Sequence, residues 1–226
     1  MHDQMDKVLA QAARLQKLVP DAILVGGSAV YIYAEHRYSL DHDHIVANLA
    51  ERFDLILESL EREGDWITNR VVYGKIILGE LGGIETGIRQ LIRKKELEFQ
   101  TAAIGGLTLN VPTIDEITRI KAFLIIKRNQ MRDYLDFAAL SDKIGITACA
   151  QIMENLDEYY TDDSTAHEKP ALSQLLRQLC NPHPKDYRNI EQLPEYKGVA
   201  EKWKNWNYIV EMCRCIAREV LGKDNA

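Results

Sequence analysis

Two aspartates separated by one residue, Asp41 and Asp43, are the pair in this sequence best suited to chemistry. If they enter the strand predicted for residues 44–47, both side chains point to the same face, because successive strand residues alternate. Two carboxylates on one face repel each other unless a cation lies between them, and Mg²⁺ or Mn²⁺ prefers such oxygen ligands. The pair therefore predicts a divalent-metal site. A solvent-exposed acidic strand edge is the alternative, because aspartates also mark loops.

A glycine-rich turn precedes the aspartates. Gly26, Gly27 and Ser28 follow the short apolar run at 22–25. Glycines let the backbone approach a ligand closely, and the free N–H groups at the start of a helix suit a phosphate. We expect Ser28 to cap a helix that runs to about residue 35 and to add a hydroxyl to the site. A metal beside this turn could bridge the protein and a triphosphate.

The elements that must position these residues change in kind along the chain. Short β-branched runs broken by glycine fill residues 66–111, and the sequence after Pro112 is almost wholly helical. We therefore predict an α+β fold, with a small mixed-sheet core over 1–112 and a helical domain over 113–226. The predicted helices cover residues 6–19, 28–35, 51–63, 113 onwards, 131–143, 147–159, 168–180 and 199–220, with loops at 161–167 and 182–194.

The order Gly-Gly-Ser, then Arg37-x-Ser39-x-Asp-x-Asp, in a strand–helix–strand context resembles the nucleotidyltransferase superfamily. The sequence is most similar to the AbiEii-type nucleotidyltransferase toxins, over about residues 20–145. Lys121, followed by Arg132, Asp133 and Asp136, looks like that family's lysine motif and its Arg-Asp-x-x-Asp helix. The resemblance implies transfer of a nucleoside monophosphate from an NTP to a hydroxyl of an RNA (such as tRNA) or protein acceptor, and a toxin with a cognate antitoxin. It also implies that Arg37, Ser39, Lys121 and Arg132 serve the nucleotide.

Lys121 also has an argument of its own. It lies four residues after Ile117 and three before Leu124, so it shares the inward face of its predicted helix. An inward lysine is rarely left unpaired. Its ammonium could reach phosphate across a cleft, or it could form a structural ion pair with Asp133 or Asp136. A pairing of Arg132 with Asp136, four residues apart on the next helix, is open in the same way.

Polymerase-like chemistry usually asks for a third carboxylate, either as a metal ligand or as the base for the acceptor hydroxyl. Glu85 is our choice, because it begins a strand after the Gly82-Gly83 turn. Glu80 and Glu98 are the competitors. Many superfamily members carry aspartate at this position, so glutamate is a departure from their pattern.

Composition limits the classes of partner. The net charge of −6 argues against broad, non-specific binding to nucleic acid. A local basic cluster could still serve a nucleotide or a tRNA end, and its residues are Arg89, Arg93, Lys94 and Lys95. The alternative is that these side chains form a solvated surface. The sequence has no apolar run long enough for a membrane span and no signal-peptide pattern at its start, so we expect a cytoplasmic protein. The four cysteines show no metal-binding spacing and are expected to be buried thiols.

Two other functions compete with nucleotide transfer. The dipeptide His42-Asp43, with His36 nearby, is also typical of metal-dependent phosphohydrolases, which need further ligands on helices. Otherwise His42 and His44 are expected at the surface or beside the metal carboxylates. A catalytically silent nucleotide-binding or regulatory module is the stronger competitor, because a fold does not fix a function.

Overall fold

The computed structural model describes residues 2–160 and 169–223, so the loop predicted for 161–167 lies outside the described residues. The chain divides into two compact units. The first comprises Met1–Ile32 and Tyr38–Thr113, and the second comprises Tyr33–Arg37 and Ile114–Ala226. The short segment 33–37 thus belongs with the helical unit, although the division at Pro112 would assign it to the first.

A five-stranded mixed sheet forms the centre of the first unit. Its strand order is β1-β2-β5-β4-β3, in which β2 and β5 run parallel and the other neighbours run antiparallel. A separate two-stranded hairpin is made by β6 and β7. The strands are β1 Ile23–Val25, β2 Asp41–Val46, β3 Trp66–Val72, β4 Ile76–Leu81, β5 Ile84–Gln90, β6 Phe99–Ile104 and β7 Leu107–Pro112.

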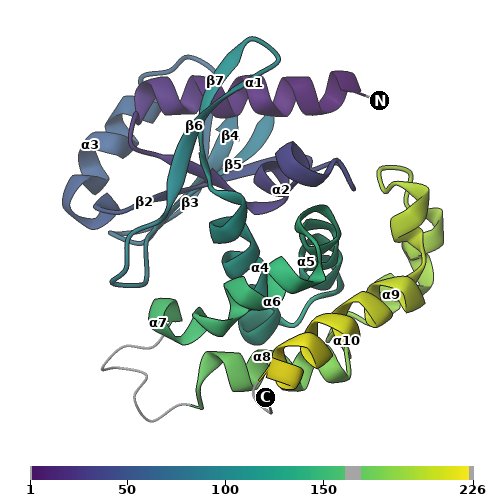
Figure 1. Cartoon of the computed structure of the whole chain (residues 1–226). Helices are drawn as coiled ribbons and strands as arrows, with labels where there is room; N and C mark the ends of the chain where they lie inside the picture. Colours follow the sequence, from purple (N-terminus) through teal and green to yellow (C-terminus); the bar gives the residue numbers. More distant parts are fainter. Residues whose placement is uncertain (1, 161–168, 224–226) are drawn as a thin grey trace. The chain divides into compact units, whose positions relative to one another are not determined.

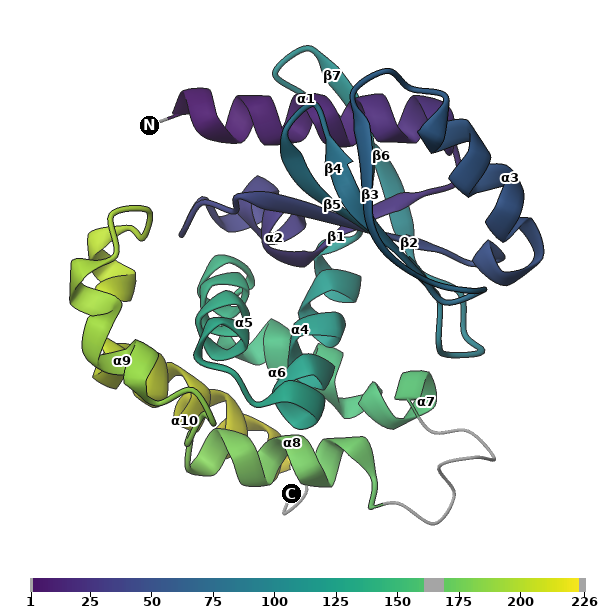
Figure 2. The same ribbon diagram turned by 180° about the vertical axis from the view of Figure 1, so that it is seen from behind.

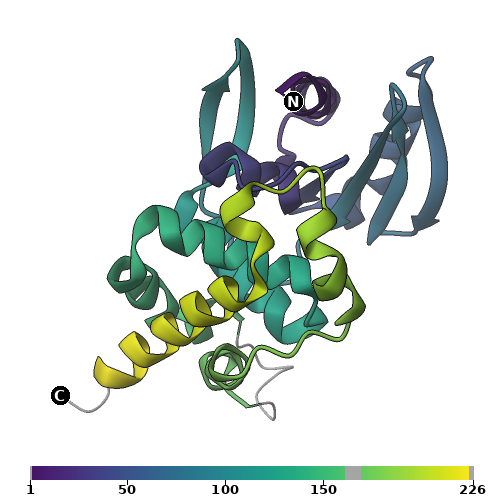
Figure 3. The same cartoon turned by 90° about the vertical axis from the view of Figure 1, so that its right-hand side faces the viewer.

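Two helices of the first unit, α1 (His2–Leu18) and α3 (Leu49–Glu61), pack with the sheet (Figure 1). Their apolar stripes meet the buried strand residues in one core, which includes Leu15, Phe53 and Ile88. Figure 3 views α1 nearly end-on, with the β6–β7 hairpin on one side and the sheet's outer strands on the other. One face of the sheet is therefore covered by the first unit's own helices.

The second unit is helical (Figure 2). Its core is built from α4, α5, α6, α8 and α10, with Tyr134 and Phe137 of α5 among the largest fully buried side chains. The elements are α4 Ile114–Arg128, α5 Met131–Ile144, α6 Ile146–Glu154, α7 Leu156–Tyr160, α8 Ala171–Cys180, α9 Arg188–Gln192, α10 Trp206–Lys223, and the 3₁₀ turns η1 Leu193–Glu195 and η2 Glu201–Lys204. Within the described residues, no helix is both long and apolar enough to cross a membrane.

The α+β fold class and most predicted elements are confirmed, but several boundaries were wrong. Helix α2 (Gly26–Ala34) begins two residues before its predicted cap, because Gly26 takes a φ of 76° that turns the chain directly from β1 into the helix. The stretch 182–194, predicted as a loop, contains α9, and the predicted helix 147–159 is divided into α6 and α7. The last predicted helix is interrupted before Trp206.

The prediction of buried thiols is right for two of the four cysteines. Cys149 and Cys213 are buried in the helical core, whereas Cys180 is exposed and Cys215 is partly exposed. Burial raises the pKa of Cys149 to about 12, so this thiol stays protonated at neutral pH.

Candidate active site

Strand β2 has two chemically different faces. Its residues alternate between partly exposed and buried along Asp41–Val46, so Asp41 and Asp43 share one face while His42 and His44 point into the core. The aspartates lie within the strand itself, which begins three residues earlier than the sequence indicates. Strict alternation on a regular strand is what brings the two carboxylates to one side.

Gly87 of β5 makes room for the Asp43 carboxylate. It is the register partner of Asp43 in the parallel β2–β5 pair. A Cβ atom placed on Gly87 would overlap Asp43 Oδ1, closer than real Cβ contacts come. The carboxylate therefore occupies the space that a side chain at Gly87 would fill. Gly87 was not among the predicted site residues, although a glycine inside an apolar strand run is a signal of close approach.

The glycine turn lies against the same carboxylate. A Cβ on Gly26 would stand 3.6 Å from Asp43 Oδ2, so the start of α2 and the acidic strand are neighbours. Gly27, in the first turn of α2, is partly exposed. The hydroxyl of Ser28 is buried and donates to the backbone carbonyl of Asp41 at 2.6 Å. Ser28 thus ties the turn to β2 rather than capping the helix, which corrects the predicted cap.

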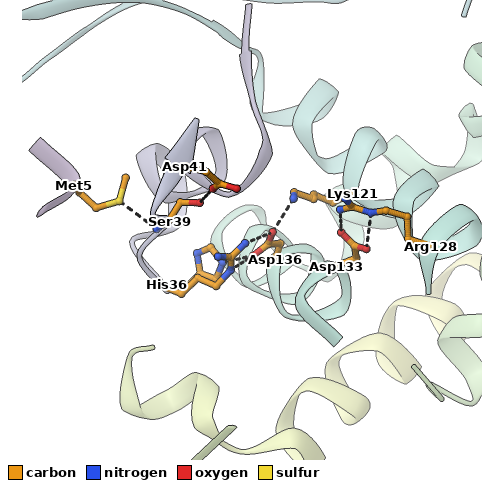
Figure 4. A network of polar contacts seen from close by, with 9 residues as sticks. Met5, His36, Ser39, Asp41, Lys121, Arg128, Asp133 and Asp136 are labelled. Atoms are coloured by element: carbon orange, nitrogen blue, oxygen red, sulfur yellow. Dashed lines mark hydrogen bonds and ion pairs between the residues drawn. The ribbon is translucent and has the colours of Figure 1, made fainter. Parts of the chain in front are cut away.

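Ser39 positions the first aspartate. Its hydroxyl donates to Asp41 Oδ1 at 2.6 Å, and its backbone N–H donates to the sulfur of Met5 at 3.3 Å (Figure 4). One oxygen of Asp41 is therefore held by a neighbour two residues away. This fixes the side chain before any ligand arrives.

The strand register ranks the candidates for a third carboxylate. Glu85 is paired with Asp41 across β2 and β5, and Glu80 is paired with Glu85 across β5 and β4, so all three share the face of the aspartates. Adjacent strands are about 4.8 Å apart, so Glu80 stands one strand spacing further from Asp41 than Glu85 does. Glu98 lies outside the five-stranded sheet. The role of Glu85 itself stays a prediction.

Arg89 belongs to the basic cluster that could serve a nucleotide, but its place beside the aspartates was not predicted. It follows Gly87 by two positions on β5 and so lies on the same face. Its Nε atom is 3.6 Å from Asp43 Oδ1, and the two side chains are 46% and 32% exposed. The basic cluster noted in the sequence therefore begins inside the acidic site.

In the second unit, a buried cluster centres on Asp136 of α5. Its carboxylate accepts hydrogen bonds from Arg37 Nε at 2.7 Å and Nη2 at 2.9 Å, and it pairs with Lys121 Nζ at 2.7 Å. His36 Nε2 is also 2.7 Å from Asp136 Oδ1 (Figure 4). Burial by itself would raise the pKa of Asp136, but Arg37 and Lys121 outweigh it and hold that pKa well below its usual range.

This cluster shows what Lys121 and Arg37 contact. The ion pair between Lys121 and Asp136, one of the two alternatives for an inward lysine, is present, and Lys121 is 2% exposed. The pairing of Arg132 with Asp136 is not found, because the partners of Asp136 are the three residues named above and Arg132 is exposed. The nucleotide contacts implied for Lys121, Arg37 and Arg132 stay predictions.

The phosphohydrolase interpretation of His42-Asp43 does not fit the structure. The two side chains point to opposite faces of β2, and His36 is buried against Asp136. His42 and His44 are fully buried, so placing them at the surface was wrong as well. Burial lowers the pKa of His42 to about 4, and it lowers the pKa of His44 well below 6.5. Both histidines are therefore neutral at pH 7.

The acidic face fits a magnesium ion. Within the described chain, no group of three or more His, Cys, Asp or Glu side chains is arranged to hold a metal. Mg²⁺, however, is commonly held by one or two carboxylates, with water and substrate phosphates completing its coordination. Two aspartates on one face, with the Asp43 carboxylate accommodated over Gly87 and a helix start beside it, match that set of ligands.

Comparison with solved structures identifies the architecture. The antibiotic-resistance factor ANT(2″)-Ia, crystallised with adenylyl-2″-tobramycin, superposes with a TM-score of 0.51 at 12% identity, over 67% of this chain and 96% of that chain. Its solution structure gives 0.51 at 13% identity, over 67% and 90%. The chain has a nucleotidyltransferase fold. At this identity, the likeness concerns the fold alone.

Sequence comparisons add less. No protein-family model matches the chain. The heme uptake protein MmpL11 of Mycobacterium tuberculosis is 26% identical over 240 aligned residues, which cover 95% of this chain and 22% of that protein. The alignments cover most of this chain, but the chain spans only about a fifth of the length of these curated relatives.

Proposed function

We propose that this protein is a Mg²⁺-dependent nucleotidyltransferase that moves a nucleoside monophosphate from an NTP to an acceptor hydroxyl. One observation carries the proposal: the Asp43 carboxylate lies between Gly26 of the glycine turn and Gly87 of β5, on the face that it shares with Asp41. A carboxylate pair and a phosphate-compatible helix start therefore adjoin each other within a nucleotidyltransferase fold.

Each part of this face has a role in the reaction. Asp41 and Asp43 would hold the divalent ion, which neutralises charge on the phosphates when bound. Gly26, Gly27 and the N–H groups at the start of α2 would hold the triphosphate, and Ser28 and Ser39 keep the strand and the Asp41 side chain in place. The acceptor oxygen attacks the α-phosphorus, the bond to the β-phosphate breaks, and pyrophosphate leaves. Exposed Glu85, beside Asp41, would accept the proton of the acceptor hydroxyl.

The identity of the acceptor rests on the resemblance to AbiEii-type toxins. We propose a cytoplasmic reaction with an RNA, such as tRNA, or a protein as acceptor, controlled by a cognate antitoxin. The same resemblance implies nucleotide contacts for Lys121, Arg37 and Arg132. Lys121 and Arg37 are held in the buried cluster around Asp136, so the reaction proposed at the acidic face does not depend on them.

The decisive experiment incubates the full chain with each labelled NTP, Mg²⁺ and total cell RNA. The double variant Asp41→Asn/Asp43→Asn is expected to lose labelling by about 10³-fold, because it loses the ligands that hold the metal. Asp54→Asn is the matched control, since Asp54 is an exposed aspartate on α3 rather than on the acidic face. Equal labelling by the double variant and the wild type would refute the assignment.

A catalytically silent nucleotide-binding module is the second candidate. The observation that favours it is the lack, among described residues, of three side chains arranged around one metal. Calorimetry with each NTP and Mg²⁺ separates the two functions. Metal-dependent NTP binding, without transfer to any RNA or protein acceptor, would favour the module.

A further inference from the structure

The ion pair between Arg89 and Asp43 is loose in comparison with the other contacts of the acidic face. The distance from Arg89 Nε to Asp43 Oδ1 is 3.6 Å, beyond hydrogen-bond length, and both side chains are partly exposed. Exposed pairs of this kind are weak, because water and salt screen both charges. The guanidinium is therefore held near the carboxylate by charge, without geometry that would resist exchange.

Gly87 is the reason that the two groups meet. Because Gly87 has no Cβ, the Asp43 carboxylate leans over β5, with Oδ1 toward Gly87 and Arg89. Its other oxygen, Oδ2, stands beside Gly26 at the start of α2. The same carboxylate thus contacts the proposed phosphate-binding turn on one side and an arginine on the other.

Two charges on this face favour a cation at Asp43. Asp41 is two residues away on the same side of β2, and Glu85 is beside Asp41 in the register. The charge of an arginine persists at every physiological pH, so Arg89 reduces this repulsion whenever no metal is bound. A divalent ion at Asp43 would have to replace that contribution.

We propose that Arg89 is an exchangeable counter-cation of Asp43. When a divalent ion binds the carboxylate, the guanidinium leaves Asp43 and pairs with a phosphate of the nucleotide. Guanidinium groups bind phosphate in a bidentate manner, so the new pair is stronger than the loose contact that it replaces. This inference rests on the proposed function, because the phosphate comes from the NTP.

The exchange predicts opposite effects on two ligands. In Arg89→Gln, Mn²⁺ alone should bind about two- to fivefold more tightly, since the competing cation is gone. Binding of an NTP in the presence of Mn²⁺ should weaken by about tenfold, because a charge-assisted hydrogen bond is lost. A residue with only a structural role would not move the two affinities in opposite directions.

The experiment measures Mn²⁺ binding to the full chain by electron paramagnetic resonance, and then NTP binding by calorimetry without any acceptor. The matched control is Arg70→Gln. Arg70 is an exposed arginine on the edge strand β3, and its pairing with Leu78 of β4 places it on the same face of the sheet. This control should leave both affinities within twofold of the wild type. Thermal unfolding of both variants checks that the fold is intact.

Each outcome bears on the exchange. Unchanged or weaker Mn²⁺ binding in Arg89→Gln would overturn it, and so would a wild-type chain that binds no Mn²⁺. If the wild type binds Mn²⁺ but no NTP, the proposed function fails and the phosphate half of the exchange fails with it. If both affinities shift as predicted but no acceptor is ever labelled, the exchange holds while catalysis does not.

Discussion

Asp136 and Asp43 carry the same functional group in the two units, in opposite environments. Asp136 is fully buried, and its oxygens meet Arg37, Lys121 and His36 at 2.7–2.9 Å. The side chain of Asp43 is 32% exposed, and Arg89 stands 3.6 Å from it. The first carboxylate is enclosed by its partners, and the second faces a surface that a ligand can reach.

The difference shows that a charged residue in a family-like motif can serve either the stability of the fold or the binding of a ligand. A buried carboxylate that is fully hydrogen-bonded holds segments together, and its loss leaves buried cations without compensation. A partly exposed carboxylate in a loose ion pair can change partners at little cost. Exposure and contact distance, rather than residue type, therefore separate the structural aspartate from the candidate metal ligand.

The largest expected effect is on stability, and it comes from the buried Asp136. Asp136→Ala should lower the free energy of unfolding by about 3–5 kcal/mol, because Arg37 and Lys121 would keep their buried charges without an anion. Urea unfolding followed by far-ultraviolet circular dichroism measures this change.

Asp142→Asn is the control for that measurement, since Asp142 pairs with Lys202 at the surface of the same unit. It should cost no more than about 1 kcal/mol. If Asp136→Ala were equally mild, the buried cluster would not be the structural centre that its geometry indicates.

On the exposed side, Gly87→Ala should act on activity more than on stability. The added methyl would overlap Asp43 Oδ1 and must displace the carboxylate. A misplacement of about 1 Å in a catalytic site costs roughly 10²-fold in rate, so a loss of this order is expected in the labelling assay. Gly64→Ala meets no atom within 4 Å and should retain full activity. Full activity in Gly87→Ala would show that Asp43 does not need its observed position.

The smallest predicted effect is on the pH dependence of stability. It comes from His42, which lies on the buried side of β2, behind the two aspartates. The pKa of His42 is about 4 in the folded protein, below the 6.5 of an unfolded chain. The unfolded state therefore takes up the proton first, so stability is fully present above pH 6.5 and is lost as the pH falls toward 4. Between pH 7 and pH 5, the loss should be about 2 kcal/mol for His42, measured by urea unfolding at each pH.

A variant of His44 tests the same explanation of the pH dependence. Burial, and next the neighbouring His42, lower the pKa of His44, and neither ring nitrogen has a hydrogen-bond partner within the described structure. His44→Leu should therefore flatten the pH dependence and leave stability at pH 7 unchanged or higher. An unaltered slope between pH 7 and pH 5 would mean that these histidines are not buried as neutral groups.

Much of the fold could be predicted because its signals are local. Periodicity and glycine turns located most strands and helices, and the change in pattern near Pro112 separated the sheet from the helical half. Local signals failed where a distant partner decided the outcome. The hydroxyl of Ser28 was expected to cap a helix, but it donates a hydrogen bond to the backbone carbonyl of Asp41, thirteen residues away.

The candidate site divides in the same way. The sequence by itself determined that Asp41 and Asp43 share a face, because alternation along a strand follows from backbone geometry. Only the tertiary structure decided what lies opposite them, because the register of β5 on β2 sets Glu85 beside Asp41 and Gly87 beside Asp43. Only it paired Arg37 with Asp136, 99 residues apart, since a buried charge takes the partner that folding brings to it.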